Sequence, residues 1–400
     1  MPNSTPAGTE RGRPARRILF VSGRLEPKGP SRAVLALARH LKQSGHDVAM
    51  ICRGGSIADV YPNQDRRRAA DDDPPIWLSR ALSNNLRGWF SLRGLVAHAR
   101  ELDPDLIHVH GASLAGVAAR LARRLRKPYV LGIGDFLDPG QSVSLSKRFI
   151  RQIIVASDAV RVDLVNRIRL PRGVVCVVPD GVDVGRYAER RPDGLTRDKV
   201  PVVGTIGRLV ESKGQEFFIR AAYLLAMRGR KVQFVIAGEG PDRKRLQNLV
   251  SELDLVDRIT FARMPVDELD VLSAIDIMVA PARLESLRLP VIEAMASGIP
   301  VIATSAGGVF TLIENRKTGI LVPKDNSDEL ALAVEDLLDH PDFAAGLAAR
   351  GRQVVAEKSN IEAAAQRTAA VYEAALSGEA PAASGADTDA AGPAVRARPA

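Results

Sequence analysis

Short runs of apolar and β-branched residues alternate with longer amphipathic segments along most of the chain. In the first half, such runs predict strands at Ile18–Ser22, Asp47–Cys52, Leu106–His110 and Tyr129–Ile133. Between the first two runs, Ser31–Ser44 has the periodicity of an amphipathic helix. Strands that alternate with helices in this way predict a parallel α/β sheet.

The same alternation resumes after Val200. Strands are predicted at Val202–Ile206, Gln233–Ala237, Arg258–Phe261, Ile277–Ala280 and Pro300–Ala303. Helices are predicted between them at Glu216–Met227, Arg243–Leu253 and Pro290–Ser297. We therefore expect an α/β protein with two doubly wound, Rossmann-like domains. Such domains bind ligands at the carboxyl ends of their strands, and a cleft between domains is a common site.

The two ends of the chain and its middle lack an apolar period. The middle segment is polar and rich in Arg, Asp and Gly, and the ends are rich in Pro, Gly, Ala and Ser. The segments that we predict are a disordered tail at 1–15, an N-terminal domain at 16–182, a linker at 183–199, a C-terminal domain at 200–360, a closing helix at 361–376 and a disordered tail at 377–400.

Composition is that of ordinary soluble domains: of 400 residues, 46% are hydrophobic and 26% charged. No apolar run approaches the roughly 18 residues of a membrane span, and no signal-peptide core is present. We therefore expect a cytoplasmic protein. The two cysteines, Cys52 and Cys176, lie in or beside apolar runs. They are expected to be reduced core thiols, and they exclude a disulfide framework.

The net charge of +9 is unevenly distributed. Residues 1–180 carry 29 Lys and Arg against 16 Asp and Glu, whereas the remainder carries 27 against 31. A basic N-terminal half favours an anionic partner such as nucleic acid or a membrane surface, although a charge excess is also typical of a solvated face. Only 4% of the residues are aromatic and able to stack on bases, so we expect no nucleic-acid partner.

Two cations follow the predicted strand Val202–Ile206. Arg208 comes directly after Gly207, and Lys213 stands five residues further on. A small residue lets the backbone approach a phosphate, while a planar guanidinium and a mobile ammonium can clamp a diphosphate. The alternative is a solvated loop with incidental cations. After the next strand, Gly238 and Gly240 permit a tight turn without forming a dinucleotide-binding fingerprint.

Two glutamates flank the start of the helix predicted at Pro290. Glu285 precedes the helix, Leu289 and Pro290 suit its first turn, and Glu293 lies within it. The helix N-terminus offers N–H groups to an anion, and carboxylates accept hydrogen bonds from hydroxyls. A nucleotide sugar has both features. Alternatively, the helix dipole alone stabilises Glu293, and Glu285 is an ordinary loop carboxylate.

Together these motifs resemble the retaining glycosyltransferases of family four, which have the GT-B fold. The resemblance rests on Gly207-Arg208 with Lys213-Gly214, on Gly238-Glu-Gly240-Pro, and on Glu285 spaced to Glu293 before Ala-Met-Ala-Ser-Gly-Ile-Pro. Weaker matches extend it over most of the chain, at Leu102–Gly111, Pro179–Asp183, Gly307–Gly308 and Thr318–Pro323.

The resemblance implies roles for individual residues. The candidate catalytic residues are Arg208 and Lys213, which would bind the donor diphosphate, and Glu285, which would bind the donor sugar. Glu293 would bind the ribose hydroxyls. The remaining candidates for donor binding are Gly207, Gly238, Gly240, Leu289, Pro290, Gly307 and Gly308, with Gly29 and Arg32 from the N-terminal domain. The position of Arg32, at the start of the first predicted helix just after Gly29, would let it reach the donor phosphates; alternatively it is an ordinary exposed arginine.

The resemblance also implies a reaction. A UDP-, GDP- or ADP-sugar would donate its sugar to a carbohydrate or lipid-linked acceptor with retention of configuration, without a metal or another cofactor. The context would be the synthesis of cell-envelope polysaccharide, lipopolysaccharide or glycolipid, in the cytoplasm or peripherally at the inner face of the membrane.

The chain departs from the family pattern at three places. Arg288 stands where the family usually has a glycine, Gly134 where it generally has a histidine, and Lys28 where it has a glycine. The alternative function is therefore a catalytically degenerate nucleotide-sugar-binding or scaffolding protein of the same fold.

Three further features of the sequence allow more than one interpretation. His108 and His110 share one face of a strand, either as a metal pair without a third ligand or as histidines near the cleft. Asp71–Asp73 imitates a metal-binding Asp-x-Asp motif but is expected to be a solvated loop. The segment Trp77–Val96 is predicted to form one amphipathic helix. The helix either packs on the domain core or lies at an anionic leaflet, together with basic residues within it and elsewhere in the same domain. Those residues are Arg93, Arg120, Arg123, Arg124, Arg126 and Lys127.

Overall fold

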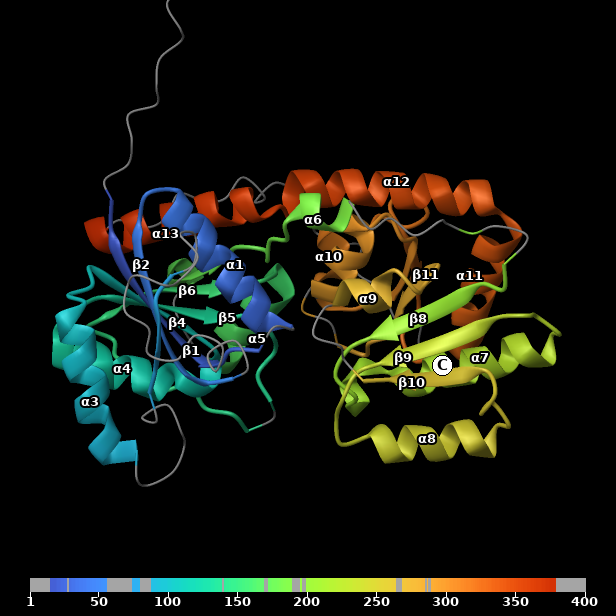
Figure 1. Cartoon of the computed structure of the whole chain (residues 1–400), viewed down its shortest axis with the longest axis horizontal. Coiled ribbons are helices and arrows are strands. Elements are labelled where there is room, and N and C mark those ends of the chain that lie inside the picture. Colours follow the sequence, from blue (N-terminus) through green and yellow to red (C-terminus); the bar gives the residue numbers. More distant parts are fainter. Residues whose placement is uncertain are drawn as a thin grey trace, which may run out of the picture.

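The computed structural model contains two parallel β-sheets, one in each half of the chain (Figure 1). It describes residues 15–26, 29–55, 74–79, 88–138, 140–168, 172–188, 195, 199–263, 268–284, 286 and 289–378. Within these residues, all strand pairings between the named strands are parallel. The expected α/β class with two doubly wound domains is confirmed.

The first sheet has the strand order β3-β2-β1-β4-β5-β6-β7. Its strands are β1 (Arg17–Arg24), β2 (Asp47–Gly54), β3 (Ile76–Leu78), β4 (Leu106–His110), β5 (Tyr129–Ile133), β6 (Ile150–Val155) and β7 (Val175–Val177). The helices of this half are α1 (Pro30–Gln43), α3 (Gly88–Glu101), α4 (Ala115–Leu125) and α5 (Asp158–Ile168), with short 3-10 turns η2 (Ala112–Leu114) and η3 (Arg172–Val174). Strands such as β1 are buried on both faces, which explains their continuous apolar runs.

The second sheet has the strand order β10-β9-β8-β11-β12-β13. Its strands are β8 (Val202–Ile206), β9 (Gln233–Ala237), β10 (Ile259–Ala262), β11 (Ile277–Ala280), β12 (Val301–Thr304) and β13 (Ile320–Val322). The helices that follow are α7 (Gln215–Met227), α8 (Arg243–Glu252), α9 (Glu268–Leu272), α10 (Leu289–Ala296), α11 (Ser327–Asp339) and α12 (Pro341–Lys358), with 3-10 turns η4 (Glu211–Lys213) and η5 (Gly307–Thr311).

Each sheet reverses its winding direction at one place. In the first sheet the reversal lies between β1 and β4, and in the second it lies between β8 and β11. Crevices at such switch points, beyond the carboxyl ends of the strands, are the usual ligand sites of doubly wound sheets. From the topology, ligand sites are therefore expected at the loops that follow β1, β4, β8 and β11.

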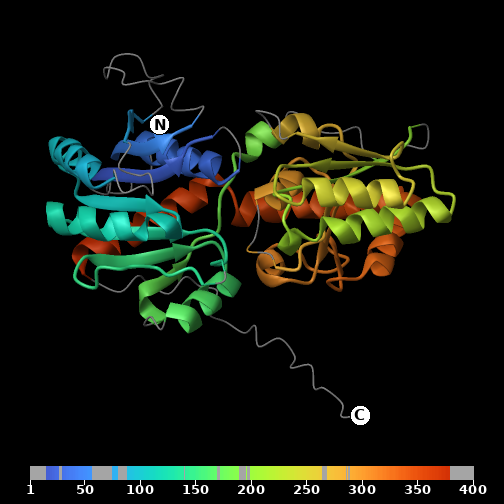
Figure 2. The ribbon, with the colours of Figure 1, turned by 90° about the horizontal axis from the view of Figure 1, so that it is seen from below.

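The last helix returns the chain to the first domain. Figures 1 and 2 show α12 and then α13 (Ile361–Ser377) running across both halves. α13 packs on α1, and its Tyr372 is fully buried in the same core as Ile18 and Phe20. The two segments that pass between the domains pair with each other through a bridge between Val182 and Asn360. These two residues stand where the sequence places the domain boundaries.

Two segments differ from the sequence prediction. The segment expected to be a polar linker begins with the short helix α6 (Val184–Ala188), in which Tyr187 is buried. The expected single helix Trp77–Val96 is wrong at its start, because Ile76–Leu78 pairs with β2 as strand β3 and the helix α3 begins at Gly88. Residues 80–87, with Leu82 and Leu86 of that prediction, lie outside the described part of the chain.

Candidate functional site

The loop after β8 carries the two predicted diphosphate ligands. Gly207 donates its N–H to the carbonyl oxygen of Ala237, which ties the start of the loop to the end of β9. Arg208 follows with an exposed side chain that forms no ion pair within the described residues. Its own carbonyl oxygen accepts a hydrogen bond from the Gln215 side chain at 3.0 Å. The guanidinium is thus presented to solvent from a loop whose backbone is fixed.

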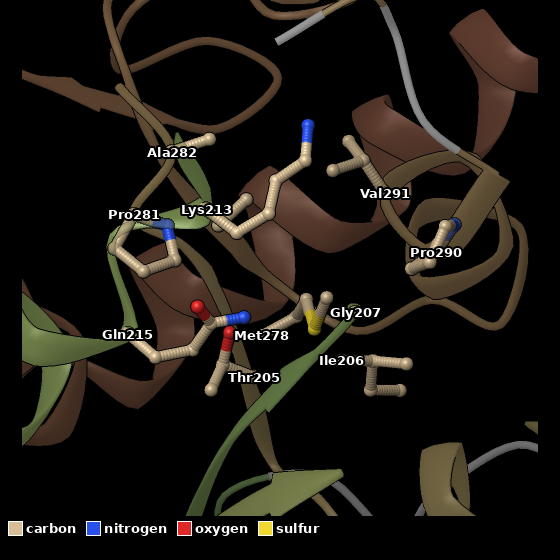
Figure 3. A pocket seen from close by; sticks show the side chains of 11 residues that line it. Thr205, Ile206, Gly207, Lys213, Gln215, Met278, Pro281, Ala282, Pro290 and Val291 are labelled. Atoms are coloured by element: carbon tan, nitrogen blue, oxygen red, sulfur yellow. The ribbon is translucent and has the colours of Figure 1, made fainter. Parts of the chain in front are cut away.

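Lys213 is buried beside Arg208's loop, with 7% of its surface exposed. Its ammonium donates to the carbonyl oxygen of Leu284 at 3.2 Å. Together with Gly207 and Pro290 it lines a small pocket of about 10 Å³. In Figure 3 the Lys213 side chain extends away from Gln215. The structure therefore places Lys213 beside the start of α10, where Lys213 and Pro290 line the same pocket.

Gly238 and Gly240 hold the β8 and β9 loops in close contact. A Cβ atom on Gly238 would lie 1.9 Å from the carbonyl oxygen of Gly207, and one on Gly240 would lie 2.1 Å from that of Leu209. Leu209 in turn donates its N–H to the carbonyl of Glu239. These glycines are required by backbone packing, and through it they set the position of Arg208.

Helix α10 begins with Leu289 and Pro290, and every residue of it except Pro290 is buried. Glu293 is 3% exposed. One of its oxygens, Oε1, accepts hydrogen bonds from Arg32 Nη2 at 2.5 Å and from Tyr187 Oη at 2.9 Å. Arg32 belongs to α1, so this contact crosses between the domains. The structure thus places Arg32 on the carboxylate of Glu293.

Gly307 and Gly308 lie at a second contact between the domains. Gly307 opens η5 with a φ of +64°, a left-handed conformation that favours glycine. A Cβ atom on Gly308 would lie 2.4 Å from the carbonyl oxygen of Ser286 and 2.8 Å from the hydroxyl of Ser157. Ser157 directly precedes α5, and α5 packs against η5. Gly308 therefore allows the two domains to approach beside the loop that carries Ser286.

A cavity of about 770 Å³ lies between the carboxyl ends of the two sheets. This volume is within the usual range of small-molecule sites. Five predicted site residues line it, namely Gly29, Gly207, Arg208, Leu289 and Pro290. Seven others do not contribute to its lining: Arg32, Lys213, Gly238, Gly240, Glu293, Gly307 and Gly308. Glu285 lies outside the described residues, as do Lys28, Leu287, Arg288 and Asp71–Asp73.

The N-terminal side of this cavity contains a stack of aromatic rings. The rings of His108 and His110 lie 4.1 Å apart, and Phe20 contacts both. His108 Nδ1 lies 2.5 Å from the hydroxyl of Tyr372 on α13. Burial lowers the pKa of His110 to about 4, and burial together with His110 lowers that of His108 well below its usual value. Both histidines are therefore neutral at pH 7.

In the described part of the chain, no third ligand joins His108 and His110 to complete a metal site. Within the described residues, no three His, Cys, Asp or Glu side chains converge as a metal site requires. The structure places both histidines in the lining of the cavity, which agrees with the alternative interpretation as histidines near the cleft.

Carboxylates line both sides of the cavity, Asp135 and Asp180 on the N-terminal side and Glu239 on the C-terminal side. Burial and the neighbouring charge of Asp135 raise the pKa of Asp180 to about 6. Asp180, Asp135 and Glu239 all line the cavity and were not among the predicted site residues. Asp180 and Glu239 lie inside motifs that the sequence singles out. Asp135 and Glu239 also follow predicted strands, so their positions were an available signal. Tyr187 carried no such signal, because it lies in the segment expected to be a linker.

Two family descriptions match the chain in consecutive stretches. Residues 27–186 match Glycosyltransferase Family 4, and residues 187–354 match Glycosyl transferases group 1.

Curated relatives agree with this match. The chain is 38% identical over 177 residues to an alpha-D-kanosaminyltransferase of Streptomyces kanamyceticus, covering 44% of this chain and 46% of the relative. It is 35% identical over 191 residues to a GDP-mannose-dependent alpha-(1-6)-phosphatidylinositol monomannoside mannosyltransferase of Mycolicibacterium smegmatis, covering 44% and 50%. The match spans about half the length of these two relatives.

Solved structures show the same architecture. Anabaena Alr3699/HepE in complex with UDP-glucose superimposes with a TM-score of 0.74 at 20% identity, covering 89% of this chain and 99% of that one. WaaG, described as a glycosyltransferase involved in lipopolysaccharide biosynthesis, gives a TM-score of 0.65 at 15% identity, covering 88% and 99%. The chain shares with them the GT-B arrangement of two facing α/β domains, as expected from the sequence.

Proposed function

Because the chain belongs to the glycosyltransferases described as family 4 and group 1, whose two descriptions together span residues 27–354, we propose that it is a retaining, metal-independent transferase. It moves a sugar from a nucleotide-diphosphate sugar to a carbohydrate or lipid-linked acceptor. The observation that carries this proposal is the cavity of about 770 Å³ between the two domains, lined by Arg208 and by the start of α10.

The donor diphosphate lies against the C-terminal side of the cavity. Arg208 is exposed on a fixed loop, Lys213 is held near the N-terminus of α10, and the first turn of α10 directs backbone N–H groups toward an anion. These groups stabilise the charge that develops on the leaving phosphate. HepE was solved with UDP-glucose, and the mycobacterial relative is named for GDP-mannose, so UDP and GDP are the first nucleotides to test.

The reaction needs no dedicated nucleophile in this proposal. The acceptor hydroxyl attacks the anomeric carbon from the face that the leaving diphosphate departs from, and the diphosphate oxygen takes the proton of that hydroxyl. Glu285 binds the donor sugar, and Glu293 accepts hydrogen bonds from the ribose hydroxyls. Preorganised positive charge is then the main catalytic device.

The acceptor occupies the N-terminal side of the cavity. The lipid that carries a lipid-linked acceptor lies at the inner face of the membrane, in cell-envelope synthesis. Basic side chains on α4 support a contact with an anionic surface, because Arg120, Arg123 and Arg124 are exposed there. None of the helices in the described ranges has both the length and the apolar composition that a bilayer crossing needs. Binding to vesicles of anionic lipid, compared with neutral vesicles, tests this part separately.

The first experiment is calorimetric titration with UDP, GDP and ADP and then with their sugar conjugates, with EDTA present. We expect one nucleotide to bind, and its sugar conjugate to bind with a different affinity. Release of nucleoside diphosphate on addition of an acceptor then measures transfer. Glu285→Gln should keep nucleotide binding and lose transfer.

The rival function is a nucleotide-sugar-binding protein without turnover, favoured by Arg288 and Gly134. Binding of donor with no transfer to any acceptor of a broad panel would support it. Absence of binding by every nucleotide would reject both functions.

A further inference from the structure

Three segments meet at the carboxylate of Glu293. Arg32 comes from α1 of the N-terminal domain, Tyr187 from α6 between the domains, and Glu293 from α10 of the C-terminal domain. Arg32 and the Tyr187 hydroxyl both donate to the same oxygen, Glu293 Oε1. The Arg32 guanidinium also contacts the Tyr187 hydroxyl and lies 5.8 Å from the centre of its ring. Each of the three side chains therefore contacts the other two.

The cluster is largely removed from water. The side chain of Glu293 is 4% exposed and that of Arg32 is 15% exposed, while Tyr187 is 3% exposed as a whole. Removing one partner of a desolvated ion pair is costly, because the other charge is left uncompensated. Burial and the Glu293 charge raise the pKa of Tyr187, so its hydroxyl stays protonated and donates. The arrangement thus resists rearrangement when a ligand binds.

Its position links it to both walls of the cavity. Glu293 lies three residues after Pro290, almost one helical turn along α10, and Pro290 lines the cavity. Arg32 lies three residues after Gly29, which lines the cavity from the other domain. Neither Arg32 nor Glu293 lines the cavity itself. The cluster therefore lies next to residues that line the cavity from both domains.

We propose that Arg32 and Tyr187 are positioning residues for Glu293, and that through them the N-terminal domain sets the affinity of the C-terminal domain for the donor ribose. They fix the rotamer and the charge of the carboxylate that accepts hydrogen bonds from the ribose hydroxyls. This rests on the proposed function, in which Glu293 binds those hydroxyls. It differs from the sequence prediction that Arg32 contacts the donor phosphates directly.

The test compares two ligands that differ only at the ribose. For the nucleoside diphosphate that the wild-type protein binds, Kd is measured by calorimetry alongside Kd for its 2′,3′-dideoxy analogue. The variants are Arg32→Gln, Arg32→Lys and Tyr187→Phe, with Arg220→Gln as an exposed arginine control on α7. We expect Arg32→Gln to weaken binding of the ribonucleotide about tenfold and Tyr187→Phe to weaken it several-fold. Arg32→Lys restores part of the loss, and the dideoxy analogue binds all variants alike.

Each other outcome has a separate meaning. An equal loss for both ligands would assign Arg32 to the phosphates, and tighter binding by Arg32→Gln would show that Arg32 competes with the ribose; either overturns the positioning role. If the wild-type protein binds no nucleotide, the proposed function fails instead. Should Arg32→Gln not fold, as judged by circular dichroism, Tyr187→Phe and Arg32→Lys carry the same comparison.

Discussion

Glycines in the loops behind the C-terminal wall of the cavity and two of those on its N-terminal wall have different surroundings. A Cβ atom on Gly238 or Gly240 would collide with a backbone oxygen of the neighbouring loop. One on Gly29 or Gly134 would meet no atom within 4 Å. The C-terminal wall is thus backed by backbones in close contact. The N-terminal wall leaves room for side chains or a ligand at Gly29 and Gly134, but not at Gly181, where a Cβ atom would lie 2.7 Å from Ala364.

Titratable groups with shifted pKa values lie on the N-terminal wall, opposite the closely packed loops of the C-terminal domain. The N-terminal wall holds His108, His110 and Asp180, whose pKa values are all shifted, mainly by burial. The C-terminal wall presents Arg208 and Glu239, which are both exposed. A wall whose shape is set by backbone atoms suits the diphosphate, a group that nucleotide-sugar donors share. A wall with more space, with neutral histidines and with carboxylates suits recognition of the acceptor, the substrate that varies.

The largest effect is expected at Arg208. In the proposed function, Arg208→Ala removes a charge-assisted hydrogen bond to the donor diphosphate, and such a bond typically contributes about 1.5–3 kcal/mol. Calorimetry should therefore show nucleotide binding weakened by about 10- to 150-fold. Arg220→Ala, an exposed arginine on α7, should leave Kd unchanged. Unchanged binding by Arg208→Ala would remove this residue from the site and end the assignment of the diphosphate to the C-terminal wall.

The close contact of the C-terminal loops predicts a loss of stability. Gly240→Ala places a methyl group where 2.1 Å separates it from the carbonyl oxygen of Leu209. Because backbone must move to accept it, the free energy of unfolding should fall by about 1–3 kcal/mol. Urea denaturation followed by circular dichroism measures this change. A variant as stable as wild type would mean that these loops have more freedom than their contacts indicate.

The sequence predicted local features well and contacts between distant segments poorly. Strands such as Leu106–His110 and Val202–Ile206 have the predicted bounds, because a buried parallel strand is a continuous apolar run. Strands β3 and β13 were not predicted, since three residues at a sheet edge are too short to show a period. The six-residue strand β6 was also not predicted.

The candidate site follows the same division. Gly207, Arg208 and Pro290 reach one cavity because the carboxyl ends of parallel strands share an edge. The pairing of Arg32 with Glu293 joins residues 261 positions apart in different domains, and Tyr187 completes it from the expected linker. No local pattern encodes such a contact, because it depends on how the domains face each other.

On the N-terminal wall, Asp180→Asn should stabilise the protein at neutral pH. The pKa of Asp180 is about 6 in the folded chain, above the usual value of 3.8, so the folded state favours the protonated carboxyl. Stability is therefore lost as pH rises between about 4 and 6, and the neutral amide avoids this loss. Allowing for partial exposure of the carboxyl, the variant should be more stable by about 1–2 kcal/mol at pH 7.5 and equal to wild type near pH 4.

Thermal denaturation at several pH values measures the difference between Asp180→Asn and wild type. His110 is common to both proteins, and its titration cancels in the comparison. A difference that does not depend on pH would show that the carboxyl titrates normally, and the contrast in electrostatics between the two walls would be lost.

The smallest effect is expected at Gly134. A Cβ atom there borders open space, and Gly134 does not have a positive φ, so Gly134→Ala introduces neither a clash nor backbone strain. It also reduces the conformational entropy of the unfolded chain, which commonly adds a few tenths of a kcal/mol to stability. The free energy of unfolding should thus stay within about 0.5 kcal/mol of wild type or rise slightly, in contrast to Gly240→Ala under the same urea titration. If the two substitutions cost the same, the walls do not differ in packing, and the acceptor can no longer be assigned to the N-terminal side on grounds of space.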